Sequence, residues 1–394
     1  MPRAMVEQGF APALMESESA PIAVRVEADL AAAEPLWRAA EAKLVATPYQ
    51  RFDACAAWAR TIGVAEGVRL AVVISTGSDG APRLILPLAI ARRGPLQLAR
   101  VMGGKHTNFS VPLFAPDAFA TGAGERIGDI LTRAAWLADI DLFAFPHVPL
   151  TWLGAANPLA ALPGMVSANI ALRGELGTDA ETTLRRIRGG LALRKLRGKE
   201  KKLAAIGAMR HVKARSDAEK TAVVAAFHAQ KATWFRERGI ADVFSPPEAA
   251  AYVAALAASG TFEFHALEVG DKIVATAAGG LSGDRFSMAF NSYDPDFARM
   301  SPGDVLLREI VTELVSRGTR HLDCGVGDAE YKRHWLSEND PMLDIAFGVG
   351  PVGRTAAATL ALGWRMKRRI KSDPRLARVA KWLRRERPTE KAEG

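Results

Sequence analysis

The predicted order of strands and helices occurs twice along this chain. In the first half, apolar alternation and helical spacing predict the order β-α-α-β-β-β-α-β between residues 23 and 145. The same order recurs between residues 210 and 324. Two similar domains are the simplest explanation of a repeated supersecondary unit. We therefore expect an α/β (α+β) fold of two tandem domains, in which each domain is a mixed, mainly antiparallel sheet flanked by helices.

The chain length also favours two domains, because 394 residues exceed what one hydrophobic core usually holds. A basic stretch over residues 182–202 lies between the repeats and predicts a connecting helix interrupted at Gly189-Gly190. The expected boundaries are a flexible arm over residues 1–20, an N-terminal domain over 21–180, the basic connecting helix over 181–205, a C-terminal domain over 206–355 and a basic helical tail over 356–394.

The net charge of +9 is unevenly distributed. Residues 185–215 hold twelve lysines and arginines and one acid, Glu200, and residues 364–394 hold twelve lysines and arginines and four acids. The rest of the chain is therefore acidic. Two basic segments on an acidic body indicate an anionic partner, such as phosphate groups, nucleic acid or a membrane surface. A solvated helix face and a disordered tail are the alternative interpretation.

Several classes of protein are disfavoured by what the sequence lacks. No apolar run reaches the length of about 18 residues that a membrane span needs, and the first 25 residues lack the apolar core of a signal peptide. The two cysteines, Cys55 and Cys324, lie far apart, and the seven histidines show no ligand spacing. Motifs of P-loop NTPases, dinucleotide-binding enzymes, zinc hydrolases and serine hydrolases are also missing. We expect a cytoplasmic protein without a metal site.

One stretch combines a strand, a loop and the start of an amphipathic helix. Ser301 is placed to cap the helix and Pro302 to occupy its first position, where the missing N–H has no cost. Gly303 allows a ligand to approach the backbone closely, and Arg299 adds a charged donor. The start of a helix offers free N–H groups and a positive dipole end, which suit a pyrophosphate. An ordinary capped helix is the alternative.

The motifs around this stretch carry a resemblance to a known family. In the second half they are Tyr293-Asp294-Pro295, Phe297-Ala298-Arg299, Ser301-Pro302-Gly303, Leu306-Leu307, Leu322-Asp323-Cys324-Gly325, Gly327, Tyr331-Lys332 and Trp335; in the first half they are Gly103-Gly104-Lys105-His106, Asn108-Phe109 and Pro112-Leu113. Over about residues 25–350 the chain resembles the GNAT-like acyltransferases linked to bacterial cellulose biosynthesis. It is also similar to the Fem-type aminoacyl transferases of peptidoglycan synthesis.

The resemblance implies tandem GNAT-like domains and the transfer of an acyl group from acetyl-CoA or another acyl-CoA to an amine or hydroxyl. It implies that the donor is bound by Asn291, Ser292, Arg299, Met300, Ser301, Pro302 and Gly303. The usual GNAT loop reads Arg/Gln-x-x-Gly-x-Gly/Ala. Arg299 fits this pattern, whereas Pro302 and Asp304 stand at the expected small positions. An aminoacyl-tRNA donor therefore stays open.

The chemistry of a thioester donor asks for few side chains, because the acyl group is already activated. A backbone N–H of Asn291 or Ser292 is a candidate donor to the thioester carbonyl, and Tyr331 is a candidate acid for the leaving thiolate. Lys332 is a candidate for stabilising negative charge, and Asp323 is the nearest candidate base. The structural alternatives are a core aromatic for Tyr331, a solvated lysine for Lys332 and a strand-end carboxylate for Asp323.

The first half has no counterpart of the Ser-Pro-Gly loop, and residues 106–114 stand in its place. We therefore expect a degenerate domain without a donor site, which shapes the acceptor groove at the domain interface. His106, Asn108 and Tyr293 are the candidate contacts for the substrate.

Three functions and two arrangements of the tail follow from this sequence. The first function is acyl transfer from acyl-CoA to a cell-envelope saccharide or its precursor; the others are tRNA-dependent aminoacyl transfer and a non-catalytic partner of a polysaccharide synthase.

In the tail, Trp364 and Trp382 lie among many lysines and arginines. This pattern is typical of a helix at an anionic membrane surface, here the inner face of the membrane. Packing of its first helix on the fold is the alternative.

Overall fold

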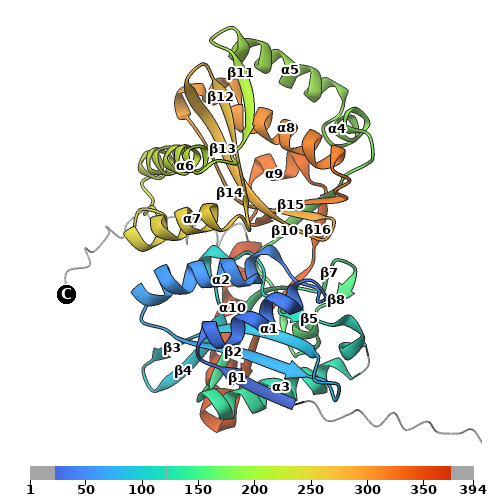
Figure 1. Cartoon of the computed structure of the whole chain (residues 1–394), viewed down its shortest axis with the longest axis vertical. Coiled ribbons are helices and arrows are strands. Elements are labelled where there is room, and N and C mark those ends of the chain that lie inside the picture. The colour runs from blue at the N-terminus through green and yellow to red at the C-terminus, as the bar shows by residue number, and fades with distance from the viewer. Residues whose placement is uncertain (1–22, 121, 374–394) are drawn as a thin grey trace, which may run out of the picture.

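A computed structural model describes residues 23–120 and 122–373. The described residues form two large sheets, one in each half of the elongated molecule, with helices packed against both (Figure 1). The expected order β-α-α-β-β-β-α-β is confirmed in both halves, and so is the mixed α/β fold class. The expected arm over residues 1–20 lies outside the described residues.

The N-terminal sheet has the strand order β1-β2-β3-β4-β6-β17-β9, with β5 paired to β3. Neighbouring strands are mostly antiparallel, and β4 runs parallel to β6. Its strands are β1 (Ala23–Glu27), β2 (Arg69–Thr76), β3 (Pro82–Arg93), β4 (Leu96–Val101), β5 (Leu113–Phe114), β6 (Leu142–Pro149), β9 (Met165–Val166) and β17 (Met342–Gly348), and a separate hairpin is formed by β7 (Thr151–Trp152) and β8 (Ala155–Ala156).

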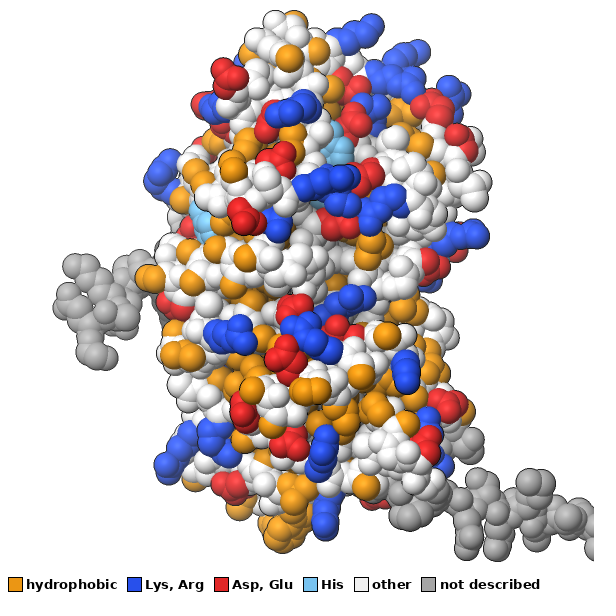
Figure 2. All heavy atoms as spheres, in the orientation of Figure 1, with side chains coloured by type: hydrophobic (Ala, Val, Ile, Leu, Met, Phe, Trp, Pro, Cys, Tyr) orange, Lys and Arg blue, Asp and Glu red, His pale blue; other side chains and the backbone are white. Residues whose placement is uncertain are grey.

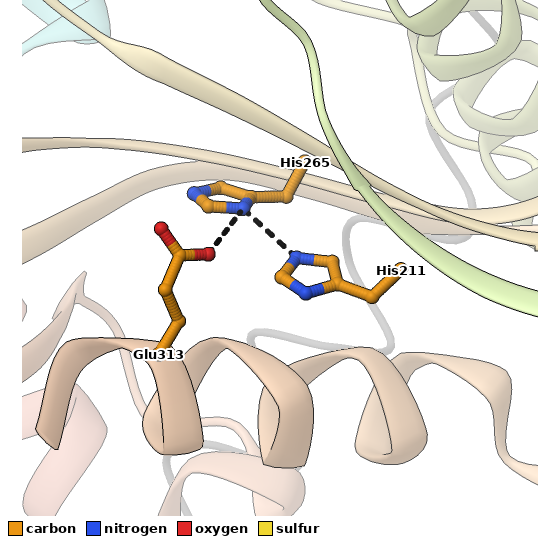
Figure 3. Close-up of side chains that lie close together, drawn as sticks. All are labelled: His211, His265 and Glu313. Carbon is orange, nitrogen blue, oxygen red and sulfur yellow. Dashed lines mark hydrogen bonds and ion pairs between the residues drawn. The ribbon is translucent and has the colours of Figure 1, made fainter. Parts of the chain in front are cut away.

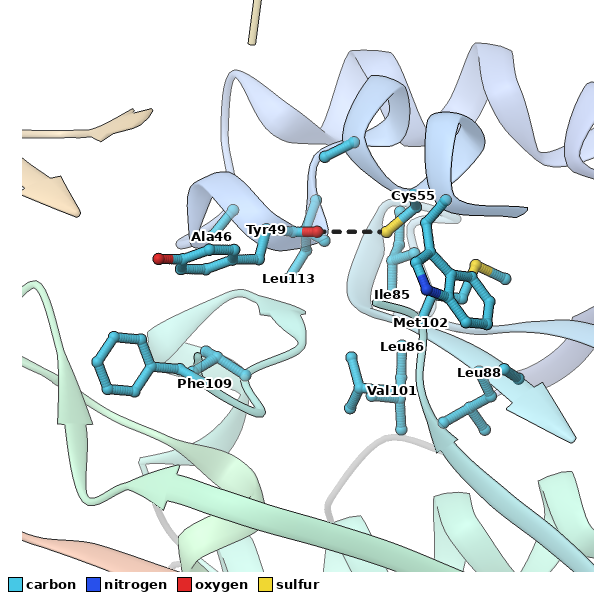
Figure 4. Packing of buried hydrophobic residues seen from close by; sticks show 14 of the residues in the cluster. Ala46, Tyr49, Cys55, Ile85, Leu86, Leu88, Val101, Met102, Phe109 and Leu113 are labelled. Atoms are coloured by element: carbon cyan, nitrogen blue, oxygen red, sulfur yellow. Dashed lines mark hydrogen bonds between the residues drawn. The ribbon is translucent and has the colours of Figure 1, made fainter. Parts of the chain in front are cut away.

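Four helices accompany this sheet: α1 (Leu30–Glu41), α2 (Phe52–Trp58), α3 (Ala123–Ala138) and α10 (Gly350–Ser372). The helix α2 continues into a π-helical turn over Ala59–Gly63. Cys55 and neighbouring side chains of α2 pack on Leu86, Leu88 and Val101 of the sheet (Figure 4). Burial raises the pKa of the Cys55 thiol, whose Sγ donates to the Tyr49 carbonyl over 3.5 Å. This cysteine is therefore a core residue.

The C-terminal sheet has the strand order β11-β12-β13-β14-β15-β10-β16. Its strands are β10 (Ala171–Glu175), β11 (Met209–Lys213), β12 (Glu263–Val269), β13 (Lys272–Ser282), β14 (Arg285–Tyr293), β15 (His321–Val326) and β16 (Glu338–Asp340). The accompanying helices are α4 (Ala180–Arg188), α5 (Gly190–Ala204), α6 (Asp217–Arg238), α7 (Pro247–Ser259), α8 (Pro302–Ser316) and α9 (Glu330–Trp335).

The helices α6 and α8 cover opposite faces of the C-terminal sheet. Phe227 of α6 packs with Phe264 and Phe290 on one face. Leu267 belongs to the other face, where it packs with Leu306 and further apolar residues of α8. Side chains alternate across a strand, so the two faces carry separate apolar clusters. The core of the C-terminal domain therefore has two parts, one packed against α6 and the other against α8.

The two domains exchange strands, which corrects the expected boundaries at residues 180 and 355. The strand β10 lies within the expected N-terminal range but pairs with β15 and β16 of the C-terminal sheet. The strand β17 lies within the expected C-terminal range but pairs with β6 and β9 of the N-terminal sheet. Short strands of this kind are stabilised by partners far away in the sequence, so local patterns do not locate them.

The connecting segment forms the two helices α4 and α5, which are separated at Gly189 as expected. Gly189 has a φ of 74°, a left-handed conformation that glycine adopts without strain. The apolar side chains Leu193, Leu196 and Leu203 of α5 are buried, so this helix is packed on the domain. Apart from the half-buried Lys199, its lysines and arginines are exposed, and Figure 2 shows basic side chains gathered at the upper right of the molecule, where α5 runs.

The first part of the predicted tail forms α10, which packs on β17 and β6. Gly353 and Ala357 are buried there, while Leu362 and Met366 are exposed. The packing is close at Gly353, where an added Cβ would lie 2.1 Å from the carbonyl oxygen of Asp141. The second predicted tail segment, residues 376–385, lies outside the described residues. Across the described residues, every helix is too short or too polar to cross a membrane.

The contact at Gly353 gives a prediction for stability. Gly353→Ala should destabilise the protein by about 1–3 kcal/mol, because the added methyl group overpacks a backbone contact. The matched control is Gly363→Ala in the same helix, where an added Cβ meets no neighbour. This control should stabilise the helix by up to about 1 kcal/mol. Urea denaturation measures both, and equal effects of the two substitutions would contradict the packing of α10.

Candidate functional site

A cavity of about 750 Å³ lies in the C-terminal domain where β14 and β15 separate. The two strands run parallel and pair only from Arg285 to Ser287 with His321 to Asp323. Beyond this point the two strands no longer pair with each other, and their last residues line the cavity. The lining comes from α6, α8, α9 and the ends of β14 and β15, so the cavity reaches both faces of the sheet.

The start of α8 forms one wall of the cavity and has no side-chain cap. Pro302 occupies the first helical position, as expected. Ser301 is the residue before it, but its hydroxyl oxygen accepts from Lys199 Nζ over 2.6 Å instead of capping the helix. Ser301 has a φ of 46°, a left-handed conformation that is strained for a residue with a Cβ. The uncapped helix start and the nearby lysine together favour an anion at this wall.

A bulge in β14 determines which of its side chains face α6 and which face α8. The register shifts between the pairs Ala278–Phe290 and Gly279–Met288, so Phe290 turns to the α6 face while Met288 stays on the α8 face. Ser292 lies on the same face as Phe290, and its hydroxyl donates to Gln230 Oε1 of α6 over 2.7 Å. Asn291 and Tyr293 lie toward the α8 face, where Tyr293 is the neighbour of Gly303.

The same alternation selects one backbone donor. The Asp294 N–H donates to Val274 of β13, so the N–H of Ser292, two residues earlier, also points toward β13. The N–H of Asn291 then points to the opposite side, into the gap between β14 and β15. Of the two donors expected from the sequence, Asn291 is the one that faces the cavity.

Tyr331 of α9 lines the cavity beside this donor. Its hydroxyl oxygen accepts from Asn291 Nδ2 over 2.9 Å, which leaves the hydroxyl proton free to point into the cavity. Burial raises the pKa of Tyr331 well above its ordinary value, and nearby Cys324 raises it further. The side chain is therefore protonated at neutral pH and can donate a hydrogen bond into the cavity.

Lys332 also lines the cavity and is 7% exposed. Its Nζ donates to the carbonyls of Gly325 and Val326, each over 3.1 Å. Burial lowers the pKa of Lys332, which nearby Cys324 and Asp323 partly oppose. A lysine ammonium has three protons, so one remains for the cavity. Lys332 thus holds the end of β15 in place and is not the solvated lysine of the alternative interpretation.

The prediction of Asp323 as a base is wrong. Its side chain is 0% exposed and does not line the cavity. One carboxylate oxygen accepts from Arg285 Nε over 2.7 Å and from Ser287 Oγ over 2.6 Å, and the other accepts from the Gly325 N–H over 2.9 Å. Burial acts against the charge of Arg285, but Asp323 and Asp340 outweigh it and raise its pKa. Asp323 therefore anchors β14 to β15 before they separate.

Asn108 and His106 lie at the domain interface and do not line the cavity. The Asn108 amide spans the separated strands, because its Nδ2 donates to Met288 of β14 over 3.5 Å and its Oδ1 accepts from Val326 of β15 over 3.1 Å. The ring of His106 packs against Phe244 and Tyr252. Their predicted role as substrate contacts is not supported by these positions, since each is used to join the domains.

Two other predicted donor contacts lie beside the cavity but do not line it. Arg299 is exposed on the turn over Pro295–Met300, and Met300 is half-buried against the apolar cluster of the α8 face. The remaining predicted residues, Asn291, Ser292, Tyr293, Ser301, Pro302, Gly303, Tyr331 and Lys332, all line the cavity.

The wall formed by α6 was not predicted from the sequence. Gln230, Lys231, Trp234 and Arg238 line the cavity from this helix. Trp234 is half-buried at the cavity, whereas Val223 and Phe227 of the same helix are buried. A signal was present in the sequence, because polar and aromatic residues recur at helical spacing over the last turns of this helix.

One group of side chains among the described residues has the donor atoms for a metal, although none was expected. It consists of His211, His265 and Glu313 on the α8 face (Figure 3). His211 Nε2 and His265 Nδ1 lie 3.0 Å apart. The Glu313 carboxylate is already paired with Lys213 and Arg317 over 3.2 and 3.4 Å. Two fixed positive charges oppose a cation here, so we interpret the group as a charge-balanced part of the core.

Comparison with known proteins identifies the domain that carries the cavity. Residues 192–333 match the family model of the acetyltransferase (GNAT) domain. The cavity-lining residues from Gln230 to Lys332 all lie inside the matched segment. No curated protein matches the sequence.

Two solved structures share the fold of the whole chain at low sequence identity. FemX is 9% identical, with a TM-score of 0.58, and the match covers 82% of this chain and 97% of that one. The C-terminal domain of a protein described as a lysylphosphatidylglycerol synthetase from Agrobacterium fabrum is 14% identical, with a TM-score of 0.52, and covers 86% and 96%. Both similarities concern the fold, and they extend over both domains.

The burial of Asp323 gives a prediction that separates structure from catalysis. Asp323→Asn should destabilise the protein by about 3–5 kcal/mol, because it leaves the buried Arg285 without one of its carboxylates. The control Asp328→Asn removes an exposed ion pair with Arg333 and should cost at most about 1 kcal/mol. Denaturant titration measures both. A fully stable Asp323→Asn variant that has lost all activity would restore Asp323 as a catalytic base.

Proposed function

We propose that this protein transfers an acyl group from acyl-CoA to an amine or hydroxyl acceptor in the cavity between β14 and β15. The matched GNAT domain supports acyl transfer as the reaction class. The observation that carries the proposal is the arrangement of three groups around one cavity: an uncapped helix start, a backbone N–H in the strand gap and the protonated Tyr331 hydroxyl.

The donor enters from the α8 face in this proposal. Its pyrophosphate lies against the first turn of α8, where Gly303 leaves room and the helix dipole favours negative charge. Lys199 lies at the same wall through its contact with Ser301. The pantetheine arm then extends along the ends of β14 and β15 and carries the thioester to Asn291 and Tyr331.

The reaction proceeds by attack of the acceptor nitrogen or oxygen on the thioester carbonyl carbon. The Asn291 N–H donates to the carbonyl oxygen as negative charge develops on it. Collapse of the tetrahedral intermediate breaks the carbon–sulfur bond, and Tyr331 gives its proton to the leaving thiolate. Tyr331 regains a proton that the acceptor loses. The amide of Asn291 orients the Tyr331 hydroxyl for this transfer.

The proposals for the acceptor, the type of enzyme and its location rest on the sequence resemblance. We propose a saccharide of the cell envelope, or its precursor, as the acceptor, and an enzyme of the cellulose-associated type. A cytoplasmic location, at the inner face of the membrane, fits such an acceptor. The basic outer part of α10, with Leu362 and Met366 exposed, supports contact with an anionic surface.

Aminoacyl-tRNA is the second candidate donor. The basic outer surface of α5 lies beside the start of α8, and Lys199 joins the two elements. A nucleic acid bound along α5 would bring its end to the cavity, and its affinity would fall steeply with salt. Salt-sensitive binding of tRNA together with no binding of CoA would favour this candidate. A chain that binds neither would be a non-catalytic partner.

The donor site gives a prediction for binding. Gly303→Val should lower the affinity for CoA at least tenfold, because a branched side chain would occupy the space beside Tyr293 where the pyrophosphate approaches. Gly363→Val, placed in α10 away from the cavity, is the control and should bind CoA like the parent chain. Calorimetry measures both affinities. Unchanged CoA affinity in a folded Gly303→Val variant would remove the donor from this wall.

The proposed acid gives a prediction for turnover. Tyr331→Phe should lower kcat by about 10²–10⁴-fold while CoA affinity changes little, because the hydroxyl acts on the leaving thiolate. Tyr293→Phe also lines the cavity and should keep turnover within a few-fold of the parent. Release of free thiol from acetyl-CoA measures turnover once an acceptor is found. Equal turnover of the Tyr331→Phe and parent chains would exclude the phenol as the acid.

A further inference from the structure

The α6 wall of the cavity carries two cations whose role the donor does not explain. Lys231 and Arg238 both lie near the Trp234 ring, with Lys231 Nζ at 5.3 Å and the Arg238 guanidinium carbon at 4.1 Å from its centroid. All three side chains line the cavity. Arg238 also donates to the Trp234 carbonyl over 3.3 Å. The ring thus attracts both cations, the half-buried Lys231 and the exposed Arg238, at the same cavity.

Lys231, Trp234 and Arg238 lie across the sheet from the start of α8, where the donor is proposed to bind. The helix α6 is held to the strands by Gln230, which donates to Ile273 over 2.9 Å and accepts from Ser292 over 2.7 Å. The helix α8 packs on the other face. A donor whose pyrophosphate lies at the start of α8 therefore leaves the α6 wall of the cavity free for another molecule.

The charges of these two side chains are incompletely balanced. Among residues 23–120 and 122–373, no carboxylate forms an ion pair with Lys231 or Arg238. Burial lowers the pKa of Lys231 to about 8, and only the more distant Asp242 opposes this effect. A half-buried cation without a paired carboxylate is costly to the fold. Such a cost is typical of a side chain kept for a ligand.

The acidic residues at the cavity lie on the other walls. Asp304 at the start of α8 accepts from Trp335 Nε1 over 2.7 Å and lies 3.8 Å from Arg188. Asp328 is paired with Arg333 over 2.6 Å. Glu330 is the first residue of α9 and is exposed. The α6 wall is therefore the positive side of the cavity.

We propose that Lys231 and Arg238 bind an anionic group of the acceptor, a phosphate or a carboxylate, and so select acceptors that carry one. This inference rests on the proposed function, since it takes the second substrate of the same site. The anion docks on α6, and the amine or hydroxyl of the same molecule then reaches the thioester between β14 and β15. Trp234 acts as a positioning residue, because it fixes the two cations that make the contact.

Calorimetry of the CoA-saturated protein tests the inference. Inorganic pyrophosphate and citrate are the phosphate and carboxylate probes, and N-acetylglucosamine is a neutral probe of similar size. Lys231→Met and Arg238→Met should each weaken binding of the preferred anion about tenfold, the loss of one charge-assisted hydrogen bond. Arg236→Met is the matched control, because this exposed arginine of α6 does not line the cavity, and it should leave the affinity within twofold.

The outcomes discriminate clearly. Binding of pyrophosphate alone supports a phosphate-bearing acceptor, and binding of citrate alone supports a carboxylate-bearing one. The inference is overturned if neither anion binds, if the α6 variants bind as the parent does, or if saturating CoA excludes the anion, since the anion site would then belong to the donor. A chain that fails to bind CoA contradicts the proposed function instead, and titration of the CoA-free variants then decides on the α6 site alone.

Discussion

The amide of Asn108 spans the gap between two strands on which the cavity depends. Asp323 and Arg285 join β14 to β15 at one end, and Asn108 keeps contact with both strands after they have separated. Gly325 makes room for the amide, because an added Cβ would lie 2.4 Å from Asn108 Nδ2. The separated strand ends therefore have hydrogen-bond partners without closing the space between them. This space is where the Asn291 N–H, Tyr331 and Lys332 meet.

This interaction explains what the N-terminal domain contributes. It provides no lining to the cavity, yet it supplies the side chain that spans the strand gap. The strands β10 and β17 each pair with the sheet of the other domain, so the exchange links the two domains to each other. The His106 ring adds a packing contact with Phe244 and Tyr252 at the same interface. The N-terminal domain thus supports the cavity of the C-terminal domain structurally.

Local signals allowed much of the fold and half of the site to be predicted. The order of strands and helices in each half is the predicted one, because alternation and caps are local patterns. The wall around Pro302 and Gly303 was predicted for the same reason. Asp323 was misassigned because its partners Arg285 and Ser287 lie on another strand. Lys231 and Arg238 were missed because the bulge that turns Ser292 toward α6, and so fixes this wall, appears only in the paired sheet.

The central claim is that one cavity takes the donor from the α8 face and the acceptor from the α6 face. A crystal structure of the complex with CoA tests it most directly. The account predicts the pyrophosphate against the first turn of α8, the thiol in the gap between β14 and β15 within hydrogen-bond reach of the Tyr331 hydroxyl, and the α6 wall left unoccupied. A CoA molecule whose pyrophosphate contacts Lys231 and Arg238, or which lies outside the cavity, would contradict it.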